Sequence, residues 1–190
     1  YSINKGLWGT SVGGKETLSS KGMLPEEAWP TQVTKTGTEE VKLGFVKGEL
    51  TSVNDQSFSH PTEAIQYLQT IAGAYGIGRD IHVGDTIIGI KGRVGFEAAA
   101  PMLILKGHHA LEKHVLTKWQ LQWKDQLASF YGNWLHEGQI LDPVMRDIEA
   151  FLSNSQQNVT GDVFIQLMPY RFQVIGIESK YDLMNSKFGK

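Results

Sequence analysis

The sequence predicts an α+β domain with a largely antiparallel sheet built from hairpins and a packed group of helices. Paired runs of alternating apolar residues, joined by turn residues, occur at 41–53 and again at 159–178. Apolar residues at helical spacing occupy about 61–75 and 101–155 between these pairs. Hairpins that alternate with helix pairs are typical of α+β domains.

The composition excludes several classes of protein. With 190 residues, 41% of them hydrophobic, the chain can bury one sizeable core, so a single domain over 1–190 is expected. The net charge of −2 gives no reason to expect nucleic acid or an anionic membrane as a partner. The absence of cysteine excludes disulfides and thiolate chemistry and fits a cytoplasmic protein. No apolar run approaches the ~20 residues that span a bilayer. Because the chain begins with Tyr1, we expect a fragment or a processed product.

The first 40 residues are rich in Gly, Thr, Ser and Pro and show no sustained periodicity. We therefore expect 1–40 to be an irregular segment on the substrate side of the domain, with at most short helical turns. Residues 9–16 nearly match a phosphate-binding loop, but the motif needs Ser or Thr after its lysine, where this chain has Glu16. No apolar strand precedes these residues either, so a phosphate site is not expected here.

A hairpin and a helix are expected next. An alternating pattern interrupted by Lys47-Gly48 predicts strands at 41–46 and 49–53. His60-Pro61 then opens a helix that Gly76 ends. Apolar residues at helical spacing predict the buried stripe of this helix: Ile65, Leu68, Ile71, Ala72 and Tyr75.

A second hairpin is predicted in the middle of the chain. Residues 86–90 form a short apolar run that suits a buried strand, Gly92-Arg93 reverses the chain, and 94–97 returns. Three charged residues are expected at or near the tip: Lys91, Arg93 and Glu97. Such a hairpin could hold a polar ligand or could be solvated, and the residue pattern alone favours the solvated hairpin.

A long helical region is expected from about residue 101 to residue 136. It follows three alanines and begins with Pro101, which a first helical turn tolerates. One helix of this length would span about 50 Å, so we expect a break near Leu116-Thr117, with Thr117 as the next N-cap. Leu105, Leu111 and Val115 are expected on one side of the first helix. An aromatic stripe on the second is typical of a core or a subunit interface: Trp119, Trp123, Leu127, Phe130 and Trp134.

The last elements are a helix and a hairpin. Asp142-Pro143 is expected to cap a helix that buries Ile148. Strands at 159–168 and 171–178 are expected to form a hairpin that turns at Pro169-Tyr170.

Three histidines and a glutamate crowd the helix before the break: His108, His109, His114 and Glu112. A zinc-binding helix needs two histidines four residues apart with a glutamate beside the first. His109 and His114 are five residues apart, so their side chains diverge, and a structural role is favoured over a metal site. His108 and Glu112 share one helical face and can hydrogen-bond.

The middle of the chain resembles the C-terminal half of argininosuccinate synthases, in which a Gly-Arg turn precedes an IG-K-R-G-YE hairpin and a helix with an HAH…LE pattern. The corresponding residues here are Gly78-Arg79, Ile88-Gly89, Lys91, Arg93, Phe96-Glu97, Lys106-Gly107-His108 and Leu111-Glu112. Further segments resemble other family patterns: Tyr1-Ser2 with Leu7 and Ser11, Tyr131-Gly132-Asn133-Trp134, and Gly176-Ile177-Glu178-Ser179. The resemblance covers nearly the whole chain, although Lys106 replaces the first histidine of HAH.

The resemblance implies the C-terminal synthetase and multimerisation domain of a cytoplasmic ligase in arginine biosynthesis. Such ligases join citrulline to aspartate through citrullyl-AMP, with ATP going to AMP and pyrophosphate. The family's ATP-binding loop lies in an N-terminal domain, so the full-length enzyme would bind ATP and Mg and the isolated fragment would bind neither and be inactive. The implied partners are a citrulline-type substrate, the protein's own N-terminal domain and further copies in a tetramer. Two alternatives stay open: a module chiefly for oligomerisation, and a diverged binding domain without catalysis.

The resemblance also places part of a citrulline pocket on this chain. Two family serines fall on Ser2 and Ser11, whose hydroxyls can donate and accept hydrogen bonds, and a family tyrosine falls on Phe96. A family glutamate twelve residues before that tyrosine falls on Gly84, so this contact is lost. Asp85 could supply a carboxylate only if the strand slipped by one residue, which turns every side chain to the other face. The lost glutamate favours a citrulline with an acylated α-amine over citrulline itself. No catalytic or metal-binding residue is expected.

Overall fold

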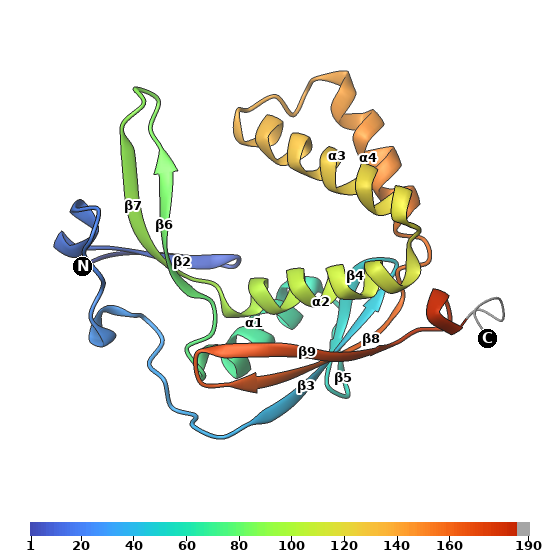
Figure 1. Ribbon diagram of the computed structural model, residues 1–190, viewed down its shortest axis with the longest axis horizontal. Helices are drawn as coiled ribbons and strands as arrows, with labels where there is room; N and C mark the ends of the chain where they lie inside the picture. Colours follow the sequence, from blue (N-terminus) through green and yellow to red (C-terminus); the bar gives the residue numbers. More distant parts are fainter. Residues whose placement is uncertain (186–190) are drawn as a thin grey trace.

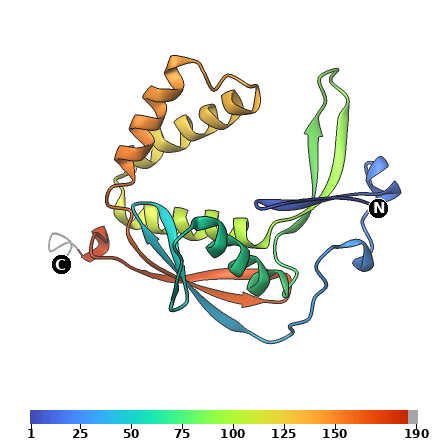
Figure 2. The same ribbon diagram turned by 180° about the vertical axis from the view of Figure 1, so that it is seen from behind.

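The computed structural model describes residues 1–185 as two antiparallel sheets and four α-helices, which confirms the predicted α+β class. Three parts are visible in Figure 1: a four-stranded sheet near the N-terminus, a body formed by a five-stranded sheet with two helices, and an arm of two further helices. Figure 2 shows the same arrangement from behind. The predicted hairpins are thus divided between two separate sheets.

The body is built on the five-stranded sheet, whose strand order is β5-β4-β3-β8-β9. Its strands are β3 (Glu39–Val46), β4 (Glu49–Val53), β5 (Gln56–Ser57), β8 (Gly161–Met168) and β9 (Arg171–Glu178). Helix α1 (Pro61–Gly73) packs against β4, and α2 (Ala99–Val115) packs against β8, β9 and α1. The predicted hairpins at 41–53 and 159–178 are confirmed. Their apolar faces and the two helices bury the main core, including Leu43, Phe45, Leu68, Leu103, Leu111, Ile165 and Leu167.

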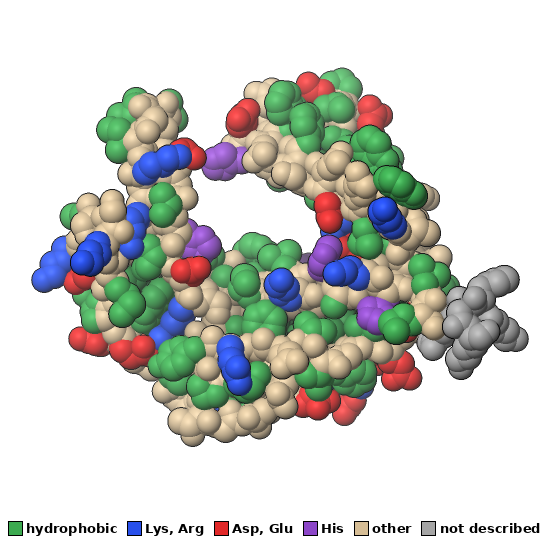
Figure 3. Space-filling view, in the orientation of Figure 1, with side chains coloured by type: hydrophobic (Ala, Val, Ile, Leu, Met, Phe, Trp, Pro, Cys, Tyr) green, Lys and Arg blue, Asp and Glu red, His purple; other side chains and the backbone are tan. Residues whose placement is uncertain are grey.

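The arm consists of α3 (Lys118–His136) and α4 (Pro143–Ser155), which project from the end of α2 (Figure 1). The predicted break is confirmed: Thr117 caps α3 by accepting from the backbone N–H of Gln120 at 3.3 Å. None of the described residues of α3 is buried. Its aromatic stripe is therefore not core. On α2, Leu111 and Val115 are buried but Leu105 is exposed, so the three do not share one side of the helix as expected. The space-filling view shows an opening between the arm and the β6–β7 hairpin (Figure 3).

The four-stranded sheet has the strand order β1-β2-β7-β6. Its strands are β1 (Ser2–Gly6), β2 (Gly9–Gly13), β6 (Arg79–Asp85) and β7 (Lys91–Glu97). A small core covers one face, where Val12 packs with Leu24, Ala28 and Trp29. The opposite face carries the candidate site. None of the helices within residues 1–185 is long and apolar enough to cross a membrane.

The prediction of an irregular segment over 1–40 is wrong for its first third, which forms the β1–β2 hairpin. All five residues of β1 are exposed, so this edge strand shows no apolar period in its sequence. Backbone pairing from Ser2 to Gly6 and the single buried residue Val12 of β2 define the hairpin instead. Residues 14–38 hold only two short 3₁₀ turns, as expected, and β3 begins at Glu39.

The strand predicted at 86–90 is also wrong, because these residues form the tip of the β6–β7 hairpin. Ile87, Ile88 and Ile90 are exposed rather than buried. Gly89 takes a positive φ of 82°, and the backbone N–H and hydroxyl of Thr86 both donate to the Ile90 carbonyl oxygen. Turn chemistry therefore reverses the chain here and not at the expected Gly92-Arg93, which lies within β7.

Candidate functional site

One face of the four-stranded sheet brings together Ser2, Ser11 and Phe96, three residues that the sequence singled out. Directly paired residues of antiparallel strands point to the same face. Asn4 of β1 pairs with Ser11 of β2, Ser11 pairs with Phe96 of β7, and Phe96 pairs with Asp80 of β6. These four residues form one line across the sheet, here called the Phe96 row. In order, the row offers an amide, a hydroxyl, an aromatic ring and a carboxylate.

Ser2 lies on the same face, next to the Phe96 row. It pairs with Gly13, which is two residues along β2 from Ser11. Diagonal neighbours of this kind have their Cα atoms about 7–8 Å apart. Ser2 and Ser11 therefore lie within the length of one small ligand, in a regular hairpin instead of the expected irregular segment.

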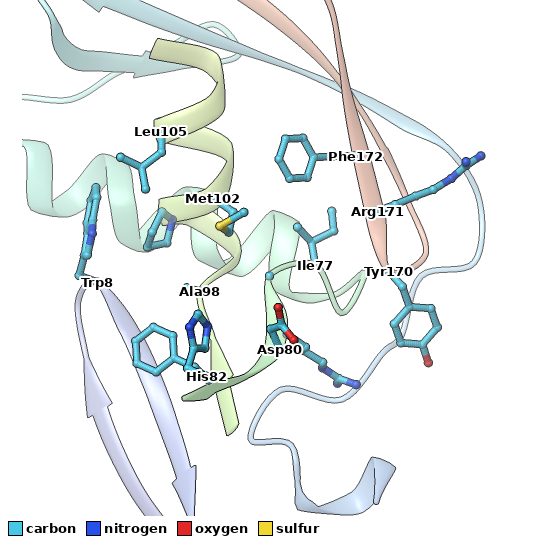
Figure 4. A pocket seen from close by; sticks show the side chains of 14 residues that line it. Trp8, Ile77, Asp80, His82, Ala98, Met102, Leu105, Tyr170, Arg171 and Phe172 are labelled. Atoms are coloured by element: carbon cyan, nitrogen blue, oxygen red, sulfur yellow. The ribbon is translucent and has the colours of Figure 1, made fainter. Parts of the chain in front are cut away.

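A pocket of about 500 Å³ adjoins the row, between the four-stranded sheet, the first turns of α2 and the β8–β9 turn (Figure 4). Its walls are mainly apolar and aromatic, with Trp8, Ile77, Phe96, Pro101, Met102, Leu105 and Phe172. Asp80 and His82 line it from β6, and the imidazole of His82 meets the Phe96 ring edge-on at 5.5 Å between centroids. Small-molecule sites commonly have this size and this mixture of apolar walls with few polar groups.

Gly84 lies on this face but nearer the hairpin tip. It is four residues along β6 from Asp80, about 13 Å at the usual rise of a strand, and it pairs with Gly92. A side-chain carbon added at Gly84 would meet nothing within 4 Å, so the position is open. The neighbouring Asp85 points to the opposite face and forms an ion pair with Lys91. Because β6 and β7 pair without a register shift, Asp85 does not replace a carboxylate at Gly84.

A cluster of charges fixes the base of the β6–β7 hairpin. The Arg79 guanidinium donates to Glu26 Oε1 at 2.7 Å and to the Thr31 carbonyl oxygen, and it lies over the Trp29 ring. Glu97 pairs with Arg79 across the strands, is buried, and accepts from Thr31 Oγ1 at 2.6 Å. Glu97 therefore holds the hairpin to the 26–31 segment, and its predicted place near the tip is wrong.

A second group of buried charges lies where α2 meets the arm. The carboxylate of Glu112 is fully buried and accepts from Lys124 Nζ at 2.7 Å and from Gln156 Nε2 at 2.8 Å. His108 Nε2 donates to Gln156 Oε1 at 2.8 Å, one helical turn before Glu112. The group thus ties α2 to both α3 and α4. Among residues 1–185, no three His, Asp or Glu side chains are placed to hold a metal ion.

The surroundings of this group shift two pKa values. Burial lowers the pKa of His108, more strongly than the charge of Glu112 raises it. Burial alone would raise the pKa of Glu112, but the charge of His108 and the contacts of Lys124 and Gln156 outweigh it and lower that pKa. Through Gln156 and Lys124, His108 and Glu112 of α2 contact the arm.

Sequence reasoning missed Asp80 and His82 because it placed the first strand of the hairpin at 86–90. With β6 at Arg79–Asp85, the two-residue period of a strand puts Asp80 and His82 on one face and Ile81 on the other. The alternation of polar and apolar residues from Asp80 to Val83 is the signal that could have revealed them.

Comparisons with known proteins agree with the residue patterns. The family model described as arginosuccinate synthase C-terminal domain matches residues 1–189. The argininosuccinate synthase of Methanocaldococcus jannaschii is 35% identical over 190 residues, which cover 98% of this chain and 48% of that protein. The argininosuccinate synthase of Xanthomonas campestris pv. campestris is 35% identical, with 98% of this chain and 47% of that protein covered. The chain therefore spans about half the length of the curated relatives it matches.

Proposed function

The chain belongs to the argininosuccinate synthase family, and from this we infer that it is the C-terminal part of an ATP-dependent carbon–nitrogen ligase. We propose that the full-length protein acts in the cytoplasm and joins citrulline, or an N-acylated citrulline, to aspartate in arginine biosynthesis. The ureido oxygen of the substrate attacks the α-phosphorus of ATP and releases pyrophosphate; the aspartate amine then displaces AMP. The match along residues 1–189 is the observation that carries this proposal.

In this proposal the two halves of the protein divide the work. Its own N-terminal domain binds ATP with Mg, and the present chain supplies one wall of the citrulline pocket. Ser2 and Ser11 bind polar groups of the substrate through their hydroxyls, and the Phe96 ring packs on its methylene groups. The strand register supports this assignment, because it places the three side chains on one face.

An N-acylated citrulline is the second candidate substrate, and Gly84 is the observation in its favour. The position has no side chain and free space around it on the substrate face. An acyl group removes the positive charge of the α-amine, so the substrate no longer needs an acidic partner. The same group would occupy the free space at Gly84.

Assembly is the second candidate function of this chain. Trp119, Trp123 and Phe130 of α3 are 63%, 57% and 41% exposed and lie on one side of the helix. Large exposed apolar patches commonly mark interaction sites. We propose that this face contacts another copy of the chain and that the full-length enzyme is a homotetramer.

The test is AMP formation by the full-length protein. With ATP, Mg, aspartate and either citrulline or N-acetylcitrulline, AMP should form at a rate that depends on every component. The isolated 190-residue chain should form none. If the full-length protein forms no AMP from either substrate, the ligase proposal is wrong; an oligomer that remains would then favour the assembly function.

A further inference from the structure

Asp80 is a carboxylate on the substrate face whose role the sequence motifs do not assign. It stands directly opposite Phe96 and projects into the pocket beside it (Figure 4). One oxygen accepts from the backbone N–H of Ile81 at 2.7 Å. Among residues 1–185 the Asp80 carboxylate forms no ion pair, and Asp80 lines the pocket.

The other charged residues around this pocket do not neutralise Asp80. Arg79 also lines the pocket, but its guanidinium donates to Glu26 and to the Thr31 carbonyl oxygen and forms no ion pair with Asp80. The guanidinium of Arg171 points away from the pocket (Figure 4). A carboxylate beside walls of Trp8, Phe96 and Met102 lowers the free energy of a cationic ligand group relative to a neutral or anionic one.

The order of groups along the Phe96 row matches the order of groups in citrulline. Ser11 and Asp80 are two strand spacings apart, about 10 Å, with the Phe96 ring between them. In an extended citrulline, the α-nitrogen and the ureido oxygen are separated by seven bonds, or about 9 Å. The ammonium can therefore reach Asp80 while the methylenes cross the ring and the ureido group reaches the Ser11 hydroxyl.

We propose that Asp80 binds the α-ammonium of the substrate and so makes this ligase specific for citrulline with a free α-amine. The inference rests on the proposed ligase function and decides between its two candidate substrates. An acylated amine carries no charge, would leave the Asp80 carboxylate without its counter-charge, and binds less well for that reason. Asp80 is in this sense a specificity-determining residue; it touches the substrate but takes no part in the transfer to ATP.

The experiment measures kcat and KM of the full-length protein for citrulline and for N-acetylcitrulline, by pyrophosphate release. Asp80→Asn keeps the shape and removes the charge. Asp80→Glu keeps the charge, and Asp85→Asn is the matched control on the opposite face of the same strand. We expect Asp80→Asn to raise KM for citrulline about 10- to 100-fold, the usual effect of losing a charged hydrogen bond. For Asp80→Asn, the KM for N-acetylcitrulline should stay within about twofold of the wild-type value. For Asp85→Asn, kcat and KM for both substrates should stay within about twofold of the wild-type values.

Asp80→Glu should give a citrulline KM between those of the wild type and Asp80→Asn, because the charge remains. Far-UV circular dichroism confirms that each variant is folded; Asp80 is exposed, so its neutralisation leaves no buried partner uncompensated. The inference is overturned if Asp80→Asn leaves the citrulline KM unchanged, or if the wild type prefers N-acetylcitrulline. A wild type that consumes neither substrate removes the ligase proposal itself, and the role of Asp80 with it.

Discussion

Replacing Lys124 by methionine should lower the free energy of unfolding by about 3 kcal/mol. The Lys124 ammonium lies 2.7 Å from the Glu112 carboxylate, whose side chain is 0% exposed, while that of Lys124 is 18% exposed. At an effective dielectric constant of about 20, two unit charges at this distance attract by roughly 6 kcal/mol, before the cost of desolvating them is subtracted. Removing one member of a buried pair usually costs ~3–5 kcal/mol. The low end applies here because Gln156 still donates to Glu112.

The measurement is urea denaturation followed by far-UV circular dichroism at pH 7. The double variant Glu112→Met/Lys124→Met should lose less stability than Lys124→Met alone, because no unpaired carboxylate stays buried. Lys106→Met is the matched control, because Lys106 is exposed on α2 and has no ion pair among residues 1–185. This substitution should change the free energy of unfolding by no more than about 0.5 kcal/mol. A loss below about 1 kcal/mol for Lys124→Met, or a double variant that is no more stable than it, would refute the reasoning.

Three further changes test other parts of the fold. Trp119→Lys should shift the full-length protein to smaller oligomers in light scattering, whereas Ser129→Lys, on another side of α3, should not; identical sizes would contradict the assembly proposal. Thr117→Ala should cost ~1 kcal/mol in urea denaturation by removing the acceptor for the Gln120 N–H, and Thr117→Ser should not; equal stability of the two variants would argue against the cap. Burial lowers the pKa of His108 below 6.5. As the pH falls through 6.5, the unfolded chain therefore protonates this histidine before the folded chain does, and the free energy of unfolding decreases. Thermal melts from pH 7 to about 5 should show that His108→Gln flattens this slope; an unchanged slope would count against it.

The elements that the sequence predicted correctly are those with local signals. Thr117 accepts from a backbone N–H three residues later, and Asp142 accepts from the N–H of Val144 at 3.0 Å. Lys47 and Gly48 take φ of 51° and 84°, which closes the β3–β4 hairpin in two residues. Each of these signals acts within four residues, so it can be recognised without knowing the packing of the rest of the chain.

The elements that were missed depend on contacts far along the chain. The apolar run around Ile88 has the composition of a buried strand, but the sequence does not show which residues pack on it. Within residues 1–185 the run is exposed. β1 has no buried residue, and its sheet is completed by β2 and β7, more than 75 residues apart. The pairing of Ser11 with Phe96 is a property of the folded sheet and has no counterpart in the local sequence.

The candidate site shows the same limit in its chemistry. A comparison with the family position by position shows that Gly84 replaces a glutamate, but it does not reveal a carboxylate at another position of the same face. A binding face, however, is assembled across strands, and Asp80 lies opposite Phe96 although sixteen residues separate them in the sequence. Asp80 and Gly84 are an even number of residues apart on β6, so both belong to one face. Asp80 therefore presents a carboxylate on the same face, four residues along β6 from Gly84. Whether a carboxylate is lost must accordingly be judged for the whole face, and on this face Asp80 supplies one.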